Sequence, residues 1–312
     1  MGQRIISSKL YERRNAVFEL MPPFPNKQMS IELTNICNHK CVFCPHSKMT
    51  RTKRHIDDDL FFRVIQEAYD LGMREVGLFI NGEPFMNPKL PEYIKRVKEI
   101  GFTYVYITTN GALATPERSA AIMDAGLDSI KFSINAGSRD TYLEIHGVDD
   151  FDTVIQNAIW HYKYRNDTHK RFNLLCSYVV TTKTMHEAKA FKDKYSYLFD
   201  DISFLKVFNR GGMIPEATSM IPDIEGKNKT EKCAHPFNCV YVTCESFLSP
   251  CALDVHLDLK LADLNCTSLR DAWYGEAMKQ FRQRFIDGFD SLHPQCRACY
   301  ENESILANIL DI

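Results

Sequence analysis

The sequence lacks the features that mark membrane proteins, exported proteins and nucleic-acid-binding proteins. In its 312 residues no apolar run approaches the roughly 20 residues that cross a bilayer. The N-terminal stretch carries charges throughout and contains no apolar core of a secretory signal. The formal net charge of −2 provides no basic excess for a polyanion. We therefore expect a cytoplasmic protein with neither a membrane nor a nucleic acid as partner.

Cysteine is plentiful, but a disulfide framework is not expected. The chain has eleven cysteines and no export signal, and cytosolic thiols stay reduced. Three of them form a C-x3-C-x2-C pattern at Cys37, Cys41 and Cys44. Others gather between residues 233 and 299, while Cys176 stands alone in an apolar run, where a small buried hydrophobe is expected. Clusters of this kind predict metal ligands.

The stretch from 29 to 45 combines a strand with the first cysteine cluster. Met29, Ile31 and Leu33 alternate with polar residues, which is the period of a half-buried β-strand. The cysteines follow in a polar loop. A structural zinc site needs four nitrogen or sulfur ligands, so either a fourth ligand such as His39 or His46 is recruited or one position stays open. An open position suits a 4Fe-4S cluster in which one iron is left for a substrate or cofactor.

The middle of the chain repeats a unit in which a helix ends at glycine and an apolar strand follows. Gly72, Gly101 and Gly126 stand at such junctions, where a left-handed residue ends a helix. Helices that alternate with nearly continuous apolar strands predict a parallel sheet buried on both faces. Six units are too few for a closed eight-stranded barrel, so we predict an α/β fold, a partial (βα)6 TIM-like barrel. Strands are expected at 29–34, 75–80, 104–108, 129–134, 173–180 and 201–207, and helices at 58–71, 89–100, 116–125, 152–165 and 185–198.

Polar motifs follow several of these strands. Ligands of parallel α/β folds bind at the carboxyl ends of the strands, so these motifs should share one edge of the sheet. The turn at 81–84, taken alone, is also an ordinary loop signal. The motif residues are Asn81, Gly82, Glu83 and Pro84 after the second strand, Thr108 and Asn110 at the third, Ser133 and Asn135 at the fourth, and Arg210 after the sixth.

Together with the cysteine loop, these motifs resemble the radical S-adenosylmethionine (radical SAM) superfamily. The resemblance implies that Cys37, Cys41 and Cys44 hold a 4Fe-4S cluster whose open iron binds the methionine half of SAM. Reductive cleavage of SAM would give a 5′-deoxyadenosyl radical, which abstracts hydrogen from a substrate. The family likeness further assigns the adenine to Phe43, the SAM amino group to Asn81, Gly82, Glu83 and Pro84, the methionine part to Thr108 and Asn110, and the ribose and carboxylate to Ser133 and Asn135. His146 stands where the family pattern leads us to expect Arg, and Arg210 is a candidate substrate contact.

The last part of the chain carries the second cysteine group. An alternating run, a turn at Glu245-Ser246 and a Pro-Cys pair predict a β-hairpin. One helix is expected to open at Thr267-Ser268 and to end at Gly288, with an apolar stripe that packs into the core. The stripe consists of Leu269, Trp273, Phe281 and Phe285.

Four cysteines of this part form a second ligand set, namely Cys233, Cys251, Cys296 and Cys299. By ligand count alone a zinc ribbon is the alternative. The layout resembles the twitch version of the SPASM domain, a small cysteine-rich hairpin-plus-helix domain with one auxiliary 4Fe-4S cluster bound entirely by protein. We therefore expect a lead-in at 1–28, a radical SAM partial barrel at 29–228 and an auxiliary-cluster domain at 229–312.

The main functional hypothesis is hydrogen abstraction from a small polar substrate, such as a sugar, an aminocyclitol or an alcohol. Dehydrogenation would pass an electron to the auxiliary cluster, and a flavodoxin or ferredoxin would supply electrons to the first. Epimerisation would need a thiol hydrogen donor, for which Cys239, Cys244 and Cys266 are candidates, although each is expected to be structural. The alternative is peptide or protein modification, but only 28 residues precede the first strand, too few for a peptide-recognition domain. The motifs at 81–84 and 108–111 disfavour a third reading, a metal scaffold without catalysis.

Overall fold

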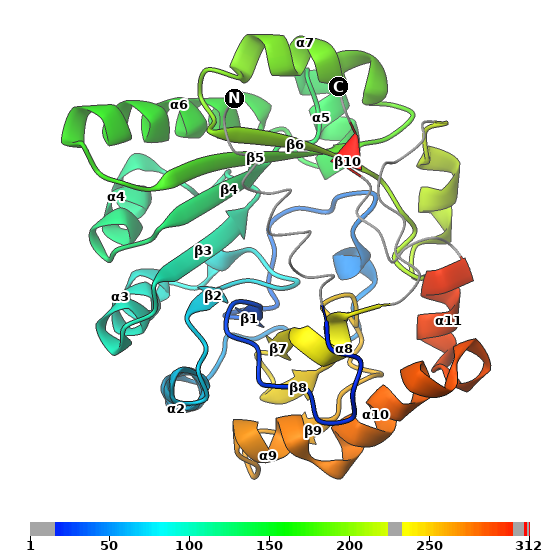
Figure 1. Ribbon diagram of the computed structural model, residues 1–312. Helices are drawn as coiled ribbons and strands as arrows, with labels where there is room; N and C mark the ends of the chain where they lie inside the picture. Colours follow the sequence, from blue (N-terminus) through cyan, green and yellow to red (C-terminus); the bar gives the residue numbers. More distant parts are fainter. Residues whose placement is uncertain (1–15, 224–232, 302–308, 311) are drawn as a thin grey trace.

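The computed structural model describes residues 16–223, 233–301, 309–310 and 312 (Figure 1). Its first elements alternate between strands and helices as the sequence predicts. The bounds are β1 (Met29–Ile31), α2 (Asp58–Asp70), β2 (Glu75–Gly77), α3 (Leu90–Ile100), β3 (Tyr104–Thr109), α4 (Pro116–Asp124), β4 (Ser129–Ser133), α5 (Arg139–His146), α6 (Phe151–Thr168), β5 (Asn173–Val180), α7 (Met185–Tyr195) and β6 (Asp201–Lys206).

The cysteine-rich part adds short elements around a hairpin. Its bounds are α8 (His235–Asn238), β7 (Val240–Val242), β8 (Phe247–Ser249), β9 (Ala262–Asp263), α9 (Leu269–Tyr274), α10 (Glu276–Asp287), α11 (Pro294–Glu301) and β10 (Ile309–Leu310).

Local signals explain where many of these elements begin and end. The Asp57 side chain accepts a hydrogen bond from the Leu60 N–H at the start of α2, and Ser138 caps α5 in the same way. The three predicted glycines after α2, α3 and α4 all have positive φ, with values of 105°, 116° and 98°. The helix-glycine-strand unit is therefore confirmed, because glycine enters this region without the steric cost of a Cβ.

The strands form one sheet in the order β10-β6-β5-β4-β3-β2-β1-β7-β8-β9. The six expected strands run parallel, and they confirm the partial barrel. The sheet continues beyond β1, since Met29 of β1 pairs in parallel with Val240 of β7. The predicted hairpin, β7 and β8, thus extends the barrel wall. The proposed boundary at 228/229 stays a prediction, and it lies outside the described residues.

The alternation of buried and accessible residues gives the sheet two different faces. On β3, Val105 and Ile107 are fully buried on the side toward the helices, whereas Tyr104, Tyr106 and Thr108 remain partly accessible on the other side. Figure 1 shows α2, α3, α4, α6 and α7 along the outer face, with the loops that follow the strands on the concave face. The concave edge is therefore where polar groups from several strands can meet.

Three sequence predictions need correction. The strands expected at 29–34 and 75–80 are shorter, since β1 ends at Ile31 and β2 at Gly77. Leu33 and Leu78 are buried although they lie beyond the ends of these strands. The single helix expected after Ser268 is two helices, α9 and α10. They meet at Gly275, whose backbone is extended (φ −73°, ψ 167°).

The break divides the predicted apolar stripe between two clusters. Leu269 and Trp273 of α9 join the main core, whereas Phe281 and Phe285 of α10 join a smaller cluster beside the second cysteine set. A Cβ at Gly275 would lie 2.4 Å from the Asp271 carbonyl oxygen, so a larger residue does not fit this junction. Within the described residues, no helix has both the length and the apolar character needed to cross a bilayer.

Candidate functional site

The loop of the first cysteine set is held against α5 by its backbone. The Lys40 N–H donates to the His146 carbonyl at 3.0 Å, and the Val42 N–H donates to the Ile145 carbonyl at 2.9 Å. A turn closes the loop, since the Cys44 N–H donates to the Cys41 carbonyl at 3.0 Å. These bonds fix the backbone on both sides of Cys41 independently of any bound metal.

The thiols of this set lie close enough to affect one another. The pKa of Cys37 is raised to about 12, mainly by burial and in smaller part by the charges of Glu83 and Cys44. Burial likewise raises the pKa of Cys41, with added contributions from Cys44 and Cys37. A bound metal would remove the protons of these cysteines on coordination and would offset the cost of burying thiolates at Cys37 and Cys41.

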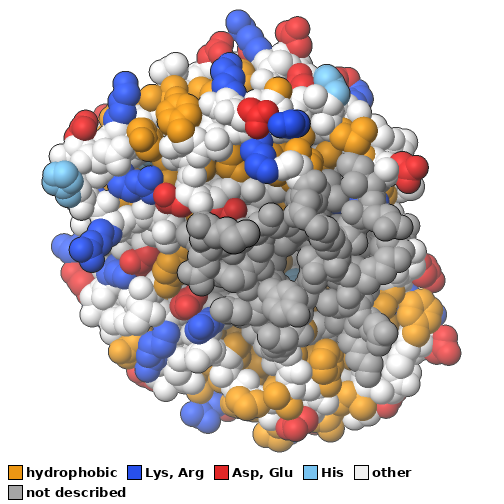
Figure 2. Space-filling view, turned by 45° about the horizontal axis from the view of Figure 1, so that its top comes forward, with side chains coloured by type: hydrophobic (Ala, Val, Ile, Leu, Met, Phe, Trp, Pro, Cys, Tyr) orange, Lys and Arg blue, Asp and Glu red, His pale blue; other side chains and the backbone are white. Residues whose placement is uncertain are grey.

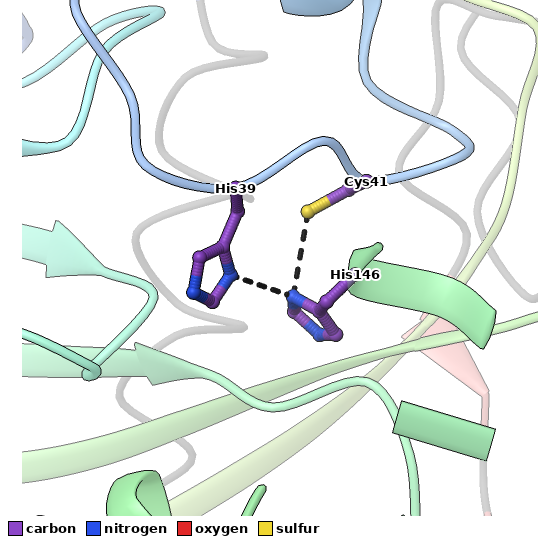
Figure 3. Close-up of side chains that lie close together, drawn as sticks. All are labelled: His39, Cys41 and His146. Carbon is purple, nitrogen blue, oxygen red and sulfur yellow. Dashed lines mark hydrogen bonds between the residues drawn. The ribbon is translucent and has the colours of Figure 1, made fainter. Parts of the chain in front are cut away.

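Two histidines support Cys41 (Figure 3). His146 Nδ1 lies 3.4 Å from the Cys41 sulfur and 3.2 Å from His39 Nδ1. The other ring nitrogens are engaged as well: His146 Nε2 lies 2.7 Å from the Ile134 carbonyl, and His39 Nε2 lies 3.1 Å from the Asp150 carboxylate. Burial, followed by the His39 charge, lowers the pKa of His146 to about 3. The imidazole that replaces the expected Arg is thus a neutral, fully buried support of the cysteine loop.

The turn after β2 is tied to its neighbours through Glu83. This carboxylate is buried and accepts hydrogen bonds from the Thr109 hydroxyl at 2.7 Å, the Asn110 N–H at 2.8 Å and the Phe85 N–H at 3.1 Å. Burial raises its pKa to about 7, although these hydrogen bonds act in the opposite direction. Glu83 therefore joins the turn after β2 to the end of β3.

Gly82 is required by a close backbone contact. A Cβ at this position would lie 2.1 Å from the Thr34 carbonyl oxygen, a distance that no side chain tolerates. The neighbouring Asn81 N–H donates to Glu32 at 3.2 Å, and the Glu83 N–H donates to the Ile36 carbonyl at 2.8 Å. The glycine thus permits the turn to lie against the segment that leads into the cysteine loop, while Pro84 begins a short 3-10 helix, Pro84–Met86.

The site residues predicted at β3 and β4 differ in whether their side chains already have a hydrogen-bond partner in the protein. The Thr108 hydroxyl is buried and has no hydrogen-bond partner in the described structure, which leaves it available to a ligand. Asn110 Nδ2 donates to Asn38 at 2.7 Å and lies 4.0 Å from the Cys37 sulfur. The Ser133 hydroxyl lies 3.3 Å from that of Ser177.

The side chain of Asn135 already has contacts within the protein. Asn135 has φ of 59°, and its Oδ1 accepts a hydrogen bond from the Val179 N–H at 2.8 Å. Its Nδ2 lies 3.3 Å from His146 Nε2. The buried ring of Phe43 also has protein contacts, since it packs with Ile145, Val207 and Ile214. The predicted SAM contacts of both residues stay predictions, and the structure gives each a packing role as well.

The second cysteine set lines a single cavity. Cys233, Cys251, Cys296 and Cys299 all belong to its lining, and Arg210 is part of the same wall. Burial raises the pKa of Cys233, with further increases from Cys251, Cys299 and Cys296, so the four sulfurs interact. The Leu253 N–H donates to the Cys251 sulfur at 3.3 Å.

A match to a known family decides the identity of the fold. The sequence model of the radical SAM superfamily matches residues 31–189, about half of the chain. The chain belongs to the radical SAM superfamily. The SPASM model, described as an iron-sulfur cluster-binding domain, matches residues 233–300 of this radical SAM protein and so includes all four cysteines of the second set.

Curated relatives match the radical SAM protein over part of its length. A protein from Metallosphaera sedula named "Probable GTP 3',8-cyclase" is 30% identical over 166 residues, which are 53% of this chain and 50% of the relative. A protein of the same name from Saccharolobus solfataricus is 35% identical over 132 residues, 42% of each chain. The chain therefore spans about half the length of the curated relatives it matches.

Solved structures share the fold over most of the chain. BtrN in complex with AdoMet and 2-DOIA has a TM-score of 0.61 at 19% identity, with 87% of this chain and 92% of BtrN covered. Streptococcus suis SuiB bound to its precursor peptide SuiA gives 0.65 at 16% identity, covering 88% and 69%. Native anSMEcpe with bound AdoMet gives 0.62 at 14% identity, covering 91% and 92%. At these identities the likeness establishes the fold of the radical SAM protein.

Both donor sets of the radical SAM protein fit the expected groups. Three thiols on one loop leave a fourth coordination position open, and the buried Thr108 hydroxyl faces no protein partner in the described residues. The second set offers four thiols around one cavity and suits a closed cluster. Zinc also accepts four thiolates, so the metal of the second site rests on the family match.

The three spare cysteines lie in different surroundings. Cys239 is buried, and it lies near enough to Cys251 to contribute, after burial and Asp254, to the raised pKa of that thiol. Cys244 is buried among carboxylates, and burial followed by Glu32 and Glu245 raises its pKa. Cys266 is exposed just after β9. Their separate positions give no shared role, and a hydrogen-donor role stays a prediction for each.

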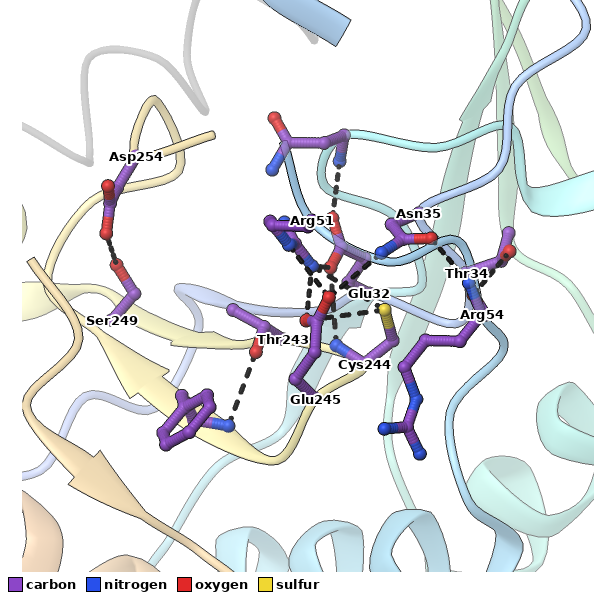
Figure 4. Close-up of polar contacts among 12 residues, drawn as sticks. Glu32, Thr34, Asn35, Arg51, Arg54, Thr243, Cys244, Glu245, Ser249 and Asp254 are labelled. Carbon is purple, nitrogen blue, oxygen red and sulfur yellow. Dashed lines mark hydrogen bonds and ion pairs between the residues drawn. The ribbon is translucent and has the colours of Figure 1, made fainter. Parts of the chain in front are cut away.

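Sequence reasoning missed a buried ion cluster that joins the two parts of the chain (Figure 4). Arg51 forms ion pairs with Glu32, which follows β1, and with Glu245, in the β7–β8 turn. Asn35 Nδ2 donates to Glu245 at 2.9 Å, and the Cys244 N–H donates to Glu32 at 3.3 Å. Glu32 is one of the polar residues of the alternating stretch at 29–34, a pattern that predicts a side chain facing solvent. No local feature of the sequence pairs Glu32 with Arg51.

The surface around the concave edge has mixed charge. Figure 2 shows Lys and Arg interspersed with Asp and Glu on the face it presents. Among the described side chains there, this pattern agrees with the net charge of −2. Among the side chains described on this face, charges so mixed form no continuous basic patch of the kind that binds a polyanion.

Proposed function

We propose that this radical SAM protein dehydrogenates a small hydroxylated substrate. The bound cluster and SAM supply an electron and a 5′-deoxyadenosyl radical. A hydrogen atom leaves the carbon that bears the hydroxyl and forms 5′-deoxyadenosine, the hydroxyl proton goes to solvent, and the remaining electron goes to the auxiliary site. The net change is the two-electron oxidation of an alcohol to a ketone, with a flavodoxin or ferredoxin as the external electron donor.

The observation that carries this proposal is the closed four-cysteine cavity beside the first cysteine loop. Four thiols leave no open position for SAM, so a cluster there would serve as an electron acceptor and not as a second SAM site. The two sets are adjacent, because charges of Cys44 and Cys41 from one set and Cys251 from the other all act on Arg210. An oxidation uses such a neighbouring acceptor, whereas a redox-neutral reaction does not need one.

The chain's own residues are assigned three tasks. The turn at 81–84 and the end of β3, joined through Glu83, would hold the methionine part of SAM. His146 and His39 would keep Cys41 in place against α5. Thr108, with its unpaired buried hydroxyl, would donate to the cofactor or substrate.

Peptide modification is the second candidate. SuiB was solved with a precursor peptide, and its fold covers 88% of this chain. However, this chain covers 69% of SuiB but 92% of BtrN, whose complex holds AdoMet and 2-DOIA rather than a peptide. Native anSMEcpe with a bound peptide is nevertheless covered to 93%, so the extent of the match does not separate the two substrate classes, and the preference for a small substrate rests on the four-cysteine cavity.

The test is SAM cleavage by anaerobically reconstituted protein with a panel of polyols, aminocyclitols and sugars. We expect 5′-deoxyadenosine to increase with a hydroxylated substrate and to carry deuterium from a substrate labelled at the oxidised carbon. A ketone should form in equal amount. Replacing Cys37, Cys41 and Cys44 by Ala should abolish cleavage and leave one cluster. Cleavage retained in this variant, or stimulated only by peptides, contradicts the proposal.

A further inference from the structure

The segment 207–217 lies between the two cysteine sets. On one side, Val207 and Ile214 pack with Phe43 of the first cysteine loop. On the other side, a Cβ at Gly211 would lie 3.3 Å from the Cys299 Cβ, so the backbone runs directly over α11. Figure 1 also shows α11 beside the segment that follows β6. This segment is a physical bridge between the two sites.

The backbone of the bridge has an unusual conformation. Arg210, Gly211 and Gly212 all have positive φ, with values of 57°, 67° and 83°. Asn209 stabilises this turn, because its Oδ1 accepts a hydrogen bond from the Gly212 N–H at 3.2 Å and its carbonyl accepts one from the Ile214 N–H at 3.1 Å. A non-glycine residue in this region costs energy, and it persists where the surroundings fix its position.

This conformation places the Arg210 guanidinium beside both cysteine sets. The side chain lines the cavity of the second set and lies over the Phe208 ring, with Cζ 4.8 Å from the ring centroid. The charges of Cys44, Cys251 and Cys41 all raise the pKa of Arg210, against the lowering by burial, so thiols of both sets lie near the guanidinium. Within the described residues, no carboxylate forms an ion pair with Arg210. A guanidinium stays protonated at all working pH values, so its charge needs another partner.

We propose that Arg210 is the shared counter-cation of the two iron-sulfur sites and that its fixed charge raises the reduction potentials of both. This inference rests on the proposed function, since it needs two clusters. A cluster with thiolate ligands carries net negative charge that grows on reduction, so a nearby cation favours the reduced form. At an effective dielectric constant of about 20 and a separation of about 10 Å, one charge changes the reduction equilibrium by about tenfold or more.

The test is an EPR-monitored redox titration of the holoenzyme and of Arg210→Gln. A tenfold change in a one-electron equilibrium is about 59 mV, so both midpoint potentials should fall by about that amount or more in the variant. Arg210→Lys keeps the charge and should restore most of the shift. Arg284→Gln is the matched control. The charge of Arg284 lowers the pKa of Cys296, so this residue also lies near the second set, but Arg284 is exposed and water should screen its effect on the potentials.

The outcomes separate this inference from the proposed function. If the unchanged protein shows only one cluster, the proposed function fails before any variant is compared. If two clusters are present and Arg210→Gln has unchanged potentials, the inference alone is wrong. A shift equal to that of Arg284→Gln also contradicts it. If Arg210→Gln assembles only one cluster, the midpoint potential of that cluster is compared with the same cluster in Arg210→Lys. A lower potential in Arg210→Gln supports the inference, and an equal potential contradicts it.

Discussion

Removing Arg51 should destabilise the protein strongly, because it leaves two buried carboxylates without their cation. The side chain of Arg51 is 4% exposed and those of Glu32 and Glu245 are 0% and 15% exposed. Burial lowers the pKa of Arg51, but the contacts with Glu245 and Glu32 outweigh it and raise the pKa above its usual value. The charge on Arg51 is therefore held firmly by its two partners.

The magnitude follows from the contacts that remain. Losing one partner of a buried ion pair costs about 3–5 kcal/mol. In Arg51→Met, Glu32 keeps the N–H donors of Asn81 and Cys244, and Glu245 keeps Asn35, so we expect the lower end, about 3 kcal/mol. In a chain of this size that lowers the unfolding midpoint by about 5 °C.

The assay is thermal unfolding of anaerobic protein, followed by circular dichroism and by the visible absorbance of the clusters. Adding Glu32→Gln and Glu245→Gln to Arg51→Met should recover most of the loss, because the whole ion cluster is then neutral. Lys48→Met removes an exposed pair with Glu216 and should leave the midpoint unchanged. An unchanged midpoint in Arg51→Met would refute the reasoning.

Three further changes test the site. Gly82→Ala should weaken SAM binding in equilibrium dialysis, since its Cβ would lie 2.1 Å from the Thr34 carbonyl oxygen; wild-type affinity would contradict the packing argument. Glu83→Gln tests the carboxyl whose pKa burial raises from 4.5 to about 7. Because the folded state holds the Glu83 proton more tightly, the protonated carboxyl contributes about 3 kcal/mol of stability below about pH 4.5, and this contribution is lost as pH rises through about 7. The free energies of unfolding of wild type and Glu83→Gln should therefore diverge over this pH range. Values that change in parallel would contradict the raised pKa. Phe43→Ala should weaken SAM binding and also cost about 3–5 kcal/mol of stability through lost packing; unchanged affinity would remove the adenine role.

Local patterns in the sequence were sufficient for the partial barrel. Apolar runs marked the strands, and three of the helix ends were marked by a glycine such as Gly101, whose positive φ the structure confirms. The cysteine sets were predicted from spacing and layout, and Cys233 and Cys251 do share a cavity with the final pair, although the ligand role of both sets stays a prediction. The turn at 81–84 was found in the same way.

Non-local contacts were beyond prediction. The parallel pairing of Met29 with Val240 joins residues far apart in the chain, and neither strand carries a signal for its partner. Arg51 lies in a loop for which the sequence predicted no role, yet it is buried between Glu32 and Glu245. The helix break at Gly275 was hidden because an apolar stripe continued across it.

Iron, sulfide and zinc content of anaerobically prepared protein shows whether the chain carries two clusters. We expect about eight irons and eight sulfides per chain, with little zinc, for two 4Fe-4S clusters. About four irons with one zinc would keep the SAM chemistry but remove the electron acceptor on which the proposed dehydrogenation depends. Zinc alone, in protein never exposed to air, would contradict the account.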